Sequence, residues 1–386
     1  MEDKVKGYVR ETLLEIAGAL ETGSFGRKTR VGVTTLGSEH GEMEVVRGAE
    51  LASKRNSHID VVVIGHNVAT ELELIKVGSE EEAHEVMDHM LREGTLDAAV
   101  TMHYSFPIGV STVGRAITPG RGAKMFIANT TGTSDTNRVV AMIKNTISGI
   151  AVAKACGIRR PTVGILNIDG ARQVEKALKK LEINGYDIDF QESARSDGGI
   201  VMRGNDLLLG VPNVMTMDSL TGNVMMKVFG AYGSGGNYEA IGYGYGPGVG
   251  EGYDRIVSII SRASGANVIA GAIGYAGVCA YGKLTDKVDD EFYKARLAGL
   301  DKIIGEIRSK DEGVEKSGVE AKMPPAKPTP ADIAGIEILE LDDAVASLWK
   351  ENIYATSGMG CTGPIVMVAD EDLTAATQIL KDKGFL

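Results

Sequence analysis

Short runs of β-branched and other apolar residues alternate with stretches of helical spacing from about residue 29 onward. The apolar runs have the length of buried strands, and the stretches between them place apolar residues on one face of a helix. Strands are expected at 29–37, 59–67, 96–102, 124–130 and 162–168, and helices at 43–54, 80–94, 134–157 and 171–185. This βαβ rhythm predicts an α/β fold with three layers, Rossmann-like, in which helices cover both faces of a mostly parallel sheet. Ligands of such sheets bind at the carboxyl ends of the strands.

The same pattern divides the chain into a large domain with a shorter segment at each end. Residues 1–28 are expected to form an amphipathic helix and residues 29–319 the main α/β domain. Prolines among polar residues at 320–332 indicate a linker. Residues 333–386 then predict strand, helix, strand and helix, which is a small C-terminal α/β unit. Within the main domain, the glycine- and tyrosine-rich segment 230–253 is expected to lack regular structure.

Charge and length narrow the class of protein. A chain of 386 residues has room for two domains, and its net charge of −11 argues against binding nucleic acid. The opening helix lacks the uninterrupted apolar core of a signal peptide, and the apolar run at 267–282 is shorter than the roughly 20 residues that span a bilayer. We therefore expect a cytoplasmic protein with no membrane span.

Metal and cofactor chemistry has little support in the sequence. The three cysteines are far apart and form no CxxC pair, and His84 and His89 lack the HExxH spacing of a zinc site. The glycines of GYGYGPGVG lack the strand-to-helix setting of a dinucleotide fingerprint, so a dehydrogenase is a weak alternative. We expect no metal and no cofactor.

The segment ANTTGTSDTNRV at 128–139 follows an expected strand and precedes a long helix. Hydroxyl groups, a permissive glycine and the free amides of a helix start are typical of anion binding. Simple capping of the helix by Ser134 or Thr133 is the alternative. The candidate phosphate-binding residues here are Thr130, Thr131, Gly132, Thr133, Ser134 and Asn137.

Two further stretches carry candidate polar groups. In DSLTGNVMMK, Gly222 permits a turn, and Asn223 and Lys227 lie four residues apart on one face of the following helix, where both could address an oxyanion. Arg115, in a loop rich in glycine, suits a phosphate or carboxylate. An ordinary capped turn with a surface lysine, and a solvated arginine, are the alternatives.

Cys361 stands apart from Cys156 and Cys279, which lie in helical or apolar settings typical of packing residues. It lies in SGMGCTGPIVMV, a glycine-rich loop before the last expected strand. Backbone amides of such a loop could reach the carbonyl oxygen of an acyl thioester. No histidine or aspartate flanks the thiol, so activation would have to come from amide dipoles or from elsewhere in the protein.

Four motifs together resemble the PlsX-type phosphate acyltransferases. They are VGVTTLGSEHGEMEVVRGAELA, ANTTGTSDTN, VGILNIDG and DSLTGNVMMK, and the likeness covers residues 29–285. Two departures are clear: TTLGSEHGE replaces the early acidic, double-glycine signature of that family, and DSLTGN replaces its DGFTGN. A PlsX-like core followed by a cysteine-bearing tail resembles the alpha subunits of component C of the glycine/sarcosine/betaine reductase complex.

This resemblance implies a fold like that of PlsX and phosphate acetyltransferases, with a C-terminal extension. It also implies that Cys361 carries an acetyl thioester, which inorganic phosphate converts to acetyl phosphate. From the residues themselves, we hypothesise that the helix start at 130–137, with Asn223 and Lys227, holds the phosphate. The implied partners are the beta subunit of component C and the selenoprotein component, and an oligomer is expected. Direct action on acyl carrier protein or coenzyme A thioesters, and a non-catalytic acyl-binding scaffold, remain the alternatives.

Overall fold

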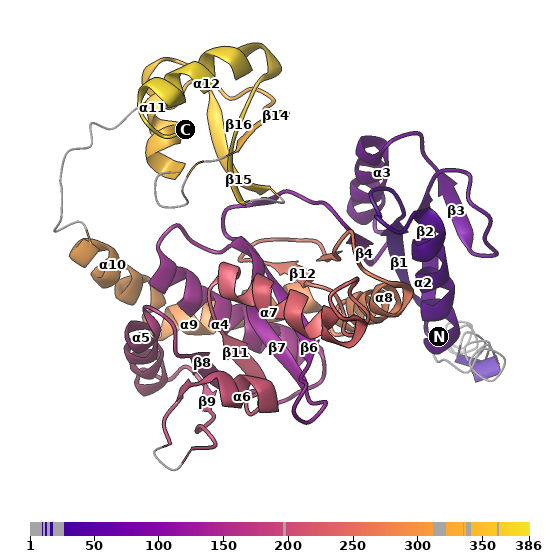
Figure 1. The fold of residues 1–386 in the computed structure, drawn as a ribbon. Helices are drawn as coiled ribbons and strands as arrows, with labels where there is room; N and C mark the ends of the chain where they lie inside the picture. The colour runs from indigo at the N-terminus through magenta and orange to yellow at the C-terminus, as the bar shows by residue number, and fades with distance from the viewer. Residues whose placement is uncertain are drawn as a thin grey trace, which may run out of the picture. The chain divides into compact units, whose positions relative to one another are not determined.

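The computed structural model describes residues 10, 12–13, 16–17, 27–195, 198–311, 322–334, 336, 341–360 and 363–386. The expected N-terminal helix at 1–28 therefore lies mostly outside the described residues. The chain forms two compact units, which are described separately (Figure 1). Unit 1 comprises Met1–Met102, Lys227–Pro247 and Asp254–Leu284, and unit 2 comprises His103–Met226, Gly248–Tyr253 and Thr285–Leu386.

The sheet of unit 1 has a parallel core, as the sequence pattern predicts. Its parallel strands run in the order β13-β4-β1-β2-β3. Their bounds are β1 (Thr29–Thr34), β2 (Ile59–Gly65), β3 (Glu73–Lys76), β4 (Ala98–Thr101) and β13 (Val257–Ile259). All residues of β2 except Asp60 are buried, which agrees with the continuous apolar runs of strands that are covered on both faces.

Helices cover both faces of this sheet. They are α2 (Glu42–Arg55), α3 (Glu80–Arg92) and α8 (Ala266–Tyr281). α2 and α8 pack side by side, and a Cβ at Gly48 would lie 2.6 Å from the Ile269 side chain. α3 lies on the opposite face, where His84 contacts the Thr101 hydroxyl at 3.0 Å. The apolar run at 267–282 is thus a buried core helix, and no single helix in the described part of the chain has the length and apolar character to cross a bilayer.

The sheet of unit 2 combines parallel and antiparallel pairs. β10, β8, β11 and β7 run parallel in that order, β9 extends the β8 edge, and β6 lies antiparallel beside β7. Their bounds are β6 (Val110–Ile117), β7 (Lys124–Thr133), β8 (Thr162–Leu166), β9 (Asp189–Phe190), β10 (Val201–Met202) and β11 (Val214–Thr216). The predicted α/β fold with a mostly parallel sheet is confirmed in both units.

The helices of unit 2 also cover two faces of their sheet. They are α4 (Arg138–Ala155), α5 (Ala171–Ile183), α6 (Gly204–Leu209), α7 (Ser219–Ala231), α9 (Leu284–Leu297) and α10 (Leu300–Asp311). α4 packs so closely on β7 that a Cβ at Gly149 would lie 3.0 Å from that of Ala128. α7 covers the other face, with the Met226 sulfur 3.1 Å from a Cβ built on Gly114.

Two expectations about local structure in this region are wrong. α4 begins at Arg138 rather than Ser134, because Thr130–Thr133 continue β7 and pair with β6 as far as Val110. The segment 230–253 contains a strand, β12 (Gly246–Val249). Its first half pairs with β13 within unit 1, and its second half pairs with β6 within unit 2. Glycine has the same backbone N–H and C=O groups as other residues and can pair in a sheet. The glycine-rich composition of this segment therefore did not indicate the strand.

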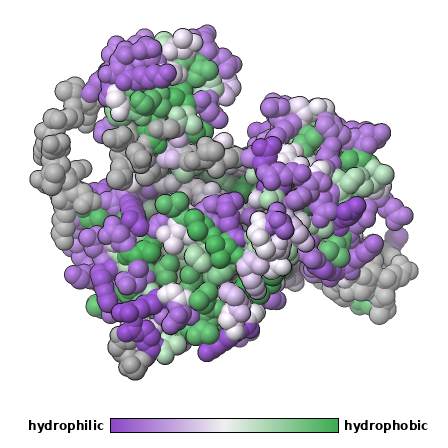
Figure 2. Space-filling view, in the orientation of Figure 1, coloured by the Kyte–Doolittle hydropathy of each residue, from purple (hydrophilic) through white to green (hydrophobic). Residues whose placement is uncertain are grey.

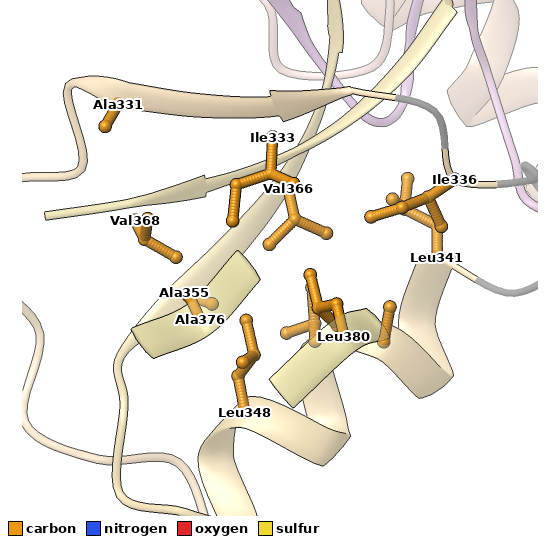
Figure 3. Close-up of a cluster of buried hydrophobic side chains, with 12 residues drawn as sticks. Ala331, Ile333, Ile336, Leu341, Leu348, Ala355, Val366, Val368, Ala376 and Leu380 are labelled. Atoms are coloured by element: carbon orange, nitrogen blue, oxygen red, sulfur yellow. The ribbon is translucent and has the colours of Figure 1, made fainter. Parts of the chain in front are cut away.

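The C-terminal part of unit 2 has its own antiparallel sheet and core. Its strands are ordered β14-β16-β15-β5, and α11 and α12 pack with them around twelve buried residues that include Leu348 and Val366 (Figure 3). The bounds are β5 (Phe106–Pro107), β14 (Ala331–Ala334), α11 (Leu341–Lys350), β15 (Ala355–Gly360), β16 (Gly363–Val368) and α12 (Leu373–Asp382). Two expectations change: β14 begins inside the predicted linker, and most of the predicted glycine-rich loop is strand β15.

We expect Leu348→Ala to loosen the C-terminal sheet, because Leu348 is fully buried in its core. Removing such a side chain leaves a cavity and costs about 2–5 kcal/mol. Hydrogen–deuterium exchange should become faster in β15 and β16. The control is Leu297→Ala, whose side chain is 71% exposed and whose effect should stay within about 0.5 kcal/mol. Unchanged protection of both strands in Leu348→Ala would contradict this account of the core.

Candidate functional site at the carboxyl end of β7

The threonine-rich end of β7 is a hydrogen-bonded strand, and its polar groups are largely used inside the protein. The Thr130 hydroxyl is fully buried and lies 2.6 Å from the Thr112 hydroxyl. The Thr131 amide donates to Asn129 Oδ1 at 2.8 Å, and Asn129 Nδ2 donates to the Gly132 carbonyl at 3.1 Å. Gly132 has φ of 76°, and a Cβ there would lie 2.6 Å from the Val110 carbonyl oxygen. Glycine is thus required at this turn.

Ser134 belongs to a buried hydroxyl network rather than to a helix start. Its hydroxyl bonds to Asn145 and lies 3.0 Å from the Ser111 hydroxyl. Asn145 in turn donates to the Met217 carbonyl at 3.3 Å. Thr133 is also buried, with 7% of its surface exposed. These groups tie β6, α4 and the end of β11 together.

A buried carboxylate precedes α4. Asp135 accepts hydrogen bonds from Lys144 Nζ at 2.6 Å and from Arg308 at 2.8 Å, and from the Asn137 amide at 3.1 Å. Burial by itself would raise the pKa of Asp135, but the bonds to Lys144, the Asn137 amide and Arg308 outweigh it and hold the pKa below its usual value. The Asn137 side chain caps α4 by accepting from the Val140 amide at 3.0 Å. The helix start is therefore capped by Asn137, and the expected cap by Ser134 or Thr133 is wrong.

The start of α7 meets the end of β7 directly. Asp218 caps this helix, accepting from the Thr221 amide and hydroxyl, each at 2.9 Å. A Cβ at Gly222 would lie 1.7 Å from the Asn129 carbonyl oxygen, so no other residue fits there. Asn223 Nδ2 donates to the Thr130 carbonyl at 3.1 Å. The structure therefore brings Gly222 and Asn223 together with Thr130.

Arg115 does not lie at the Thr133 end of β7. It pairs with Phe126 on β7, and its guanidinium carbon lies 5.5 Å from the centroid of the Phe126 ring. Phe126 precedes Thr133 by seven residues, or roughly 23 Å along an extended strand. Arg115 is therefore far from the Thr133 end of the strand.

The other predicted cation, Lys227, falls in unit 1. It is exposed, and its Nζ lies 5.5 Å from the centroid of the Tyr245 ring. Near its start, the same helix exposes Leu220 and Val224, and Figure 2 shows apolar surface in the region of α7. The role of Lys227 as a phosphate ligand stays a prediction.

Sequence reasoning missed Arg138, the first residue of α4. Its guanidinium bonds to Asp218 at 2.9 Å and to Asp169 at 3.3 Å, and 43% of its side chain is exposed. The two aspartates follow β11 and β8, so Arg138 joins the carboxyl ends of neighbouring strands. The available signal was its place directly after the helix cap in TNRVV.

Cys361 and Thr362 lie outside the described residues, but the strands on either side of them are described. β15 and β16 pair antiparallel as far as Gly360 and Gly363. Met359 pairs with Phe106 of β5. Three residues after Phe106, the Gly109 amide donates to the Thr133 carbonyl at 2.8 Å. The strand that precedes Cys361 is thus joined through β5 to the threonine-rich end of β7.

The whole chain matches known proteins. Residues 29–367 match the family model described as "Fatty acid synthesis protein", and the chain belongs to this family. It is 54% identical over 382 residues, 99% of each chain, to the "Glycine/sarcosine/betaine reductase complex component C subunit alpha" of Peptoclostridium acidaminophilum. Both resemblances drawn from the sequence are confirmed.

More distant relatives cover less of the chain. A "Phosphate acyltransferase" of Anoxybacillus flavithermus is 24% identical over an alignment of 235 residues that covers 51% of this chain and 70% of that protein. Among solved structures, a 4-hydroxythreonine-4-phosphate dehydrogenase from Burkholderia phymatum aligns with a TM-score of 0.38 and 16% identity, over 70% of this chain and 99% of that one.

Gly222→Ala should destabilise the protein, because its Cβ would overlap a backbone carbonyl that cannot move aside. We expect a loss of about 2 kcal/mol or more, seen as a lower thermal unfolding midpoint. Gly305→Ala is the matched control: Gly305 lies inside α10 with nothing within 4 Å of a new Cβ. Alanine there should stabilise by about 0.5–1 kcal/mol. Equal midpoints for Gly222→Ala and wild type would show that α7 does not rest on β7 in this way.

Asp135→Asn should cost about 3 kcal/mol at pH 7, because it leaves two cations facing a neutral group. The folded-state pKa of Asp135 is lowered, so its contribution is present above its ordinary pKa and is lost as the pH falls through the folded-state value. The difference between Asp135→Asn and wild type in urea unfolding should therefore shrink below about pH 4. Asp187→Asn, in an exposed ion pair with Arg160, is the control. A pH-independent difference would mean that the charge of Asp135 is not what stabilises this region.

Proposed function

We propose that the chain carries an acetyl group as a thioester on Cys361 and transfers it to inorganic phosphate, which releases acetyl phosphate. Membership in a family that includes phosphate acyltransferases supports the acyl-transfer chemistry. The near-complete match to a component C alpha subunit supports the setting, a reductase complex.

The proposed transfer of acetyl from the thioester to phosphate needs no cofactor. A phosphate oxygen attacks the thioester carbonyl carbon, the C–S bond breaks, and the electron pair leaves with the Cys361 sulfur as a thiolate. Phosphate dianion is already a nucleophile, so no strong general base is needed. The requirements are a site that positions phosphate and donors that stabilise the oxyanion of the tetrahedral intermediate.

The observation that carries the proposal is the pairing of β15 with β5. It joins the strand before Cys361 to β5, which leads into β6 and to the hydrogen bond between Gly109 and Thr133. This connection supports an action of Cys361 on phosphate held at the end of β7. In the proposal, phosphate binds at the carboxyl ends of β7 and β11, beside Thr131, Gly132 and Asn223. The buried hydroxyls of Thr130, Thr133 and Ser134 hold that edge in shape.

The proposed partners rest on the similarity to the component C alpha subunit. The printed name of the relative makes it one subunit of component C of a larger complex. We accordingly propose the beta subunit of component C and the selenoprotein component of the reductase as partners of this chain, within an oligomer.

A second candidate function has its own support in the distant phosphate acyltransferases. In that function the acyl group passes to phosphate directly from a thioester of coenzyme A or acyl carrier protein. Cys361 would then take no part in the chemistry.

Mass spectrometry of the full chain after incubation with acetyl phosphate separates the two candidates. We expect an acetyl adduct on Cys361 that is absent from Cys361→Ala and retained in Cys156→Ala, the control for a different, partly buried thiol. Transfer of acetyl from acetyl coenzyme A to phosphate at an undiminished rate in Cys361→Ala would favour direct transfer and overturn the carrier role.

A further inference from the structure

The edge of the sheet at which Arg138 lies has the topology of a ligand site. β11 lies between β8 and β7, so the connection through α4 passes from β7 over β11 to β8. α7 leaves β11 on the opposite face, where Met226 packs against Gly114. Where the helices that follow two neighbouring strands lie on opposite faces of a sheet, ligands bind in the crevice outside the carboxyl ends. Arg138 begins α4 at this point.

The two carboxylates that face Arg138 are not equivalent. Asp218 has 14% of its side chain exposed and is held by the Thr221 amide and hydroxyl. Asp169 has 90% of its side chain exposed and lies at the longer distance, 3.3 Å. In the described part of the chain, Arg138 is its one hydrogen-bonding partner. Exposed ion pairs are weak because water screens them, so Asp169 can be replaced by another anion while Asp218 stays.

Backbone contacts hold the loop that carries Asp169. The Asn167 amide donates to the Met202 carbonyl at 2.7 Å. Gly170 has φ of 80°, and a Cβ there would lie 3.1 Å from the Val139 side chain. The loop after β8 is therefore held against the first turn of α4. α5 begins at once with Arg172 in its first turn and no acidic residue there.

Two other cations near this edge already form ion pairs with a buried carboxylate. Lys144 and Arg308 both pair with the buried Asp135. Arg138 pairs with an exposed carboxylate, and its planar guanidinium offers more N–H donors than these two bonds use. Such a fork matches two oxygens of a phosphate.

We propose that Arg138 binds the phosphate substrate and that Asp169 is its exchangeable counter-ion in the ligand-free protein. The inference rests on the proposed function for its role in acetyl transfer. It assigns to Arg138 the part that the sequence suggested for Arg115. The bond from Arg138 to Asp218 stays in place during the exchange, so the cap of α7 is kept.

Calorimetric titration of the full chain with inorganic phosphate tests this directly. Arg138→Gln should weaken phosphate binding about tenfold or more, and Arg138→Lys should weaken it less, because the charge remains and the fork is lost. Asp169→Asn should tighten binding about two- to fivefold, because a competing negative charge is removed. Arg160→Gln, a surface arginine 3.8 Å from Asp187, should bind phosphate as the wild type does.

Asp169→Asn is the decisive variant, since a purely structural ion pair would give weaker or unchanged binding when it is broken. Weaker or unchanged phosphate binding in Asp169→Asn would overturn the inference. Unchanged binding in Arg138→Gln, or no measurable phosphate binding by the wild type, would overturn it as well. Binding is measured without acetyl chemistry, so the two proposals fail separately. Acetylated Cys361 together with Arg138-independent binding would remove only the role of Arg138. Arg138-dependent binding without an adduct would remove only the carrier function.

Discussion

The start of α7 lies directly on the backbone of β7, and a glycine at position 222 is what permits this contact. Helix and strand backbones rarely approach so closely, since any side chain on the contact point would overlap the Asn129 carbonyl. The contact brings Asn223 to the Thr130 carbonyl and sets Asp218 where Arg138 can reach it. The geometry of the carboxyl edge in unit 2 depends on it.

The polar residues at this edge divide into those that build it and those that a ligand can reach. Hydroxyls of Thr130, Thr133 and Ser134 are buried among β6, β7 and α4, and Asp135 balances Lys144 and Arg308. A helix start that follows a buried carboxylate cannot draw its attraction for phosphate from free amides alone. In our account the charge that attracts phosphate therefore comes from the exposed Arg138. Asp218 holds this arginine in place, and Asp169 is the carboxylate that phosphate replaces.

Much of the fold, and less of the site, could be predicted from the sequence. β2, β8 and α5 match their apolar patterns within two residues at each end, and β1 within three, because burial leaves a strong signal. Which strands pair with each other leaves no comparable pattern in the sequence. Residues 130–133 belong to a strand because β6 pairs with them. The glycines of β12 and β15 also belong to strands because a neighbouring strand pairs with them, which is β6 for β12 and β16 for β15. Arg138 was missed because Asp169 and Asp218 are 31 and 80 residues away in the chain.

The central claim is that phosphate itself attacks an acetyl group held on this chain. Oxygen labelling tests it most directly: the acetylated full chain is mixed with phosphate labelled with 18O in every position, and the product is analysed by mass spectrometry. Attack by phosphate on the thioester carbonyl predicts acetyl phosphate that retains all the labelled oxygens, with the Cys361 thiol regenerated. Unlabelled acetate as the sole product, formed by water, would contradict the account.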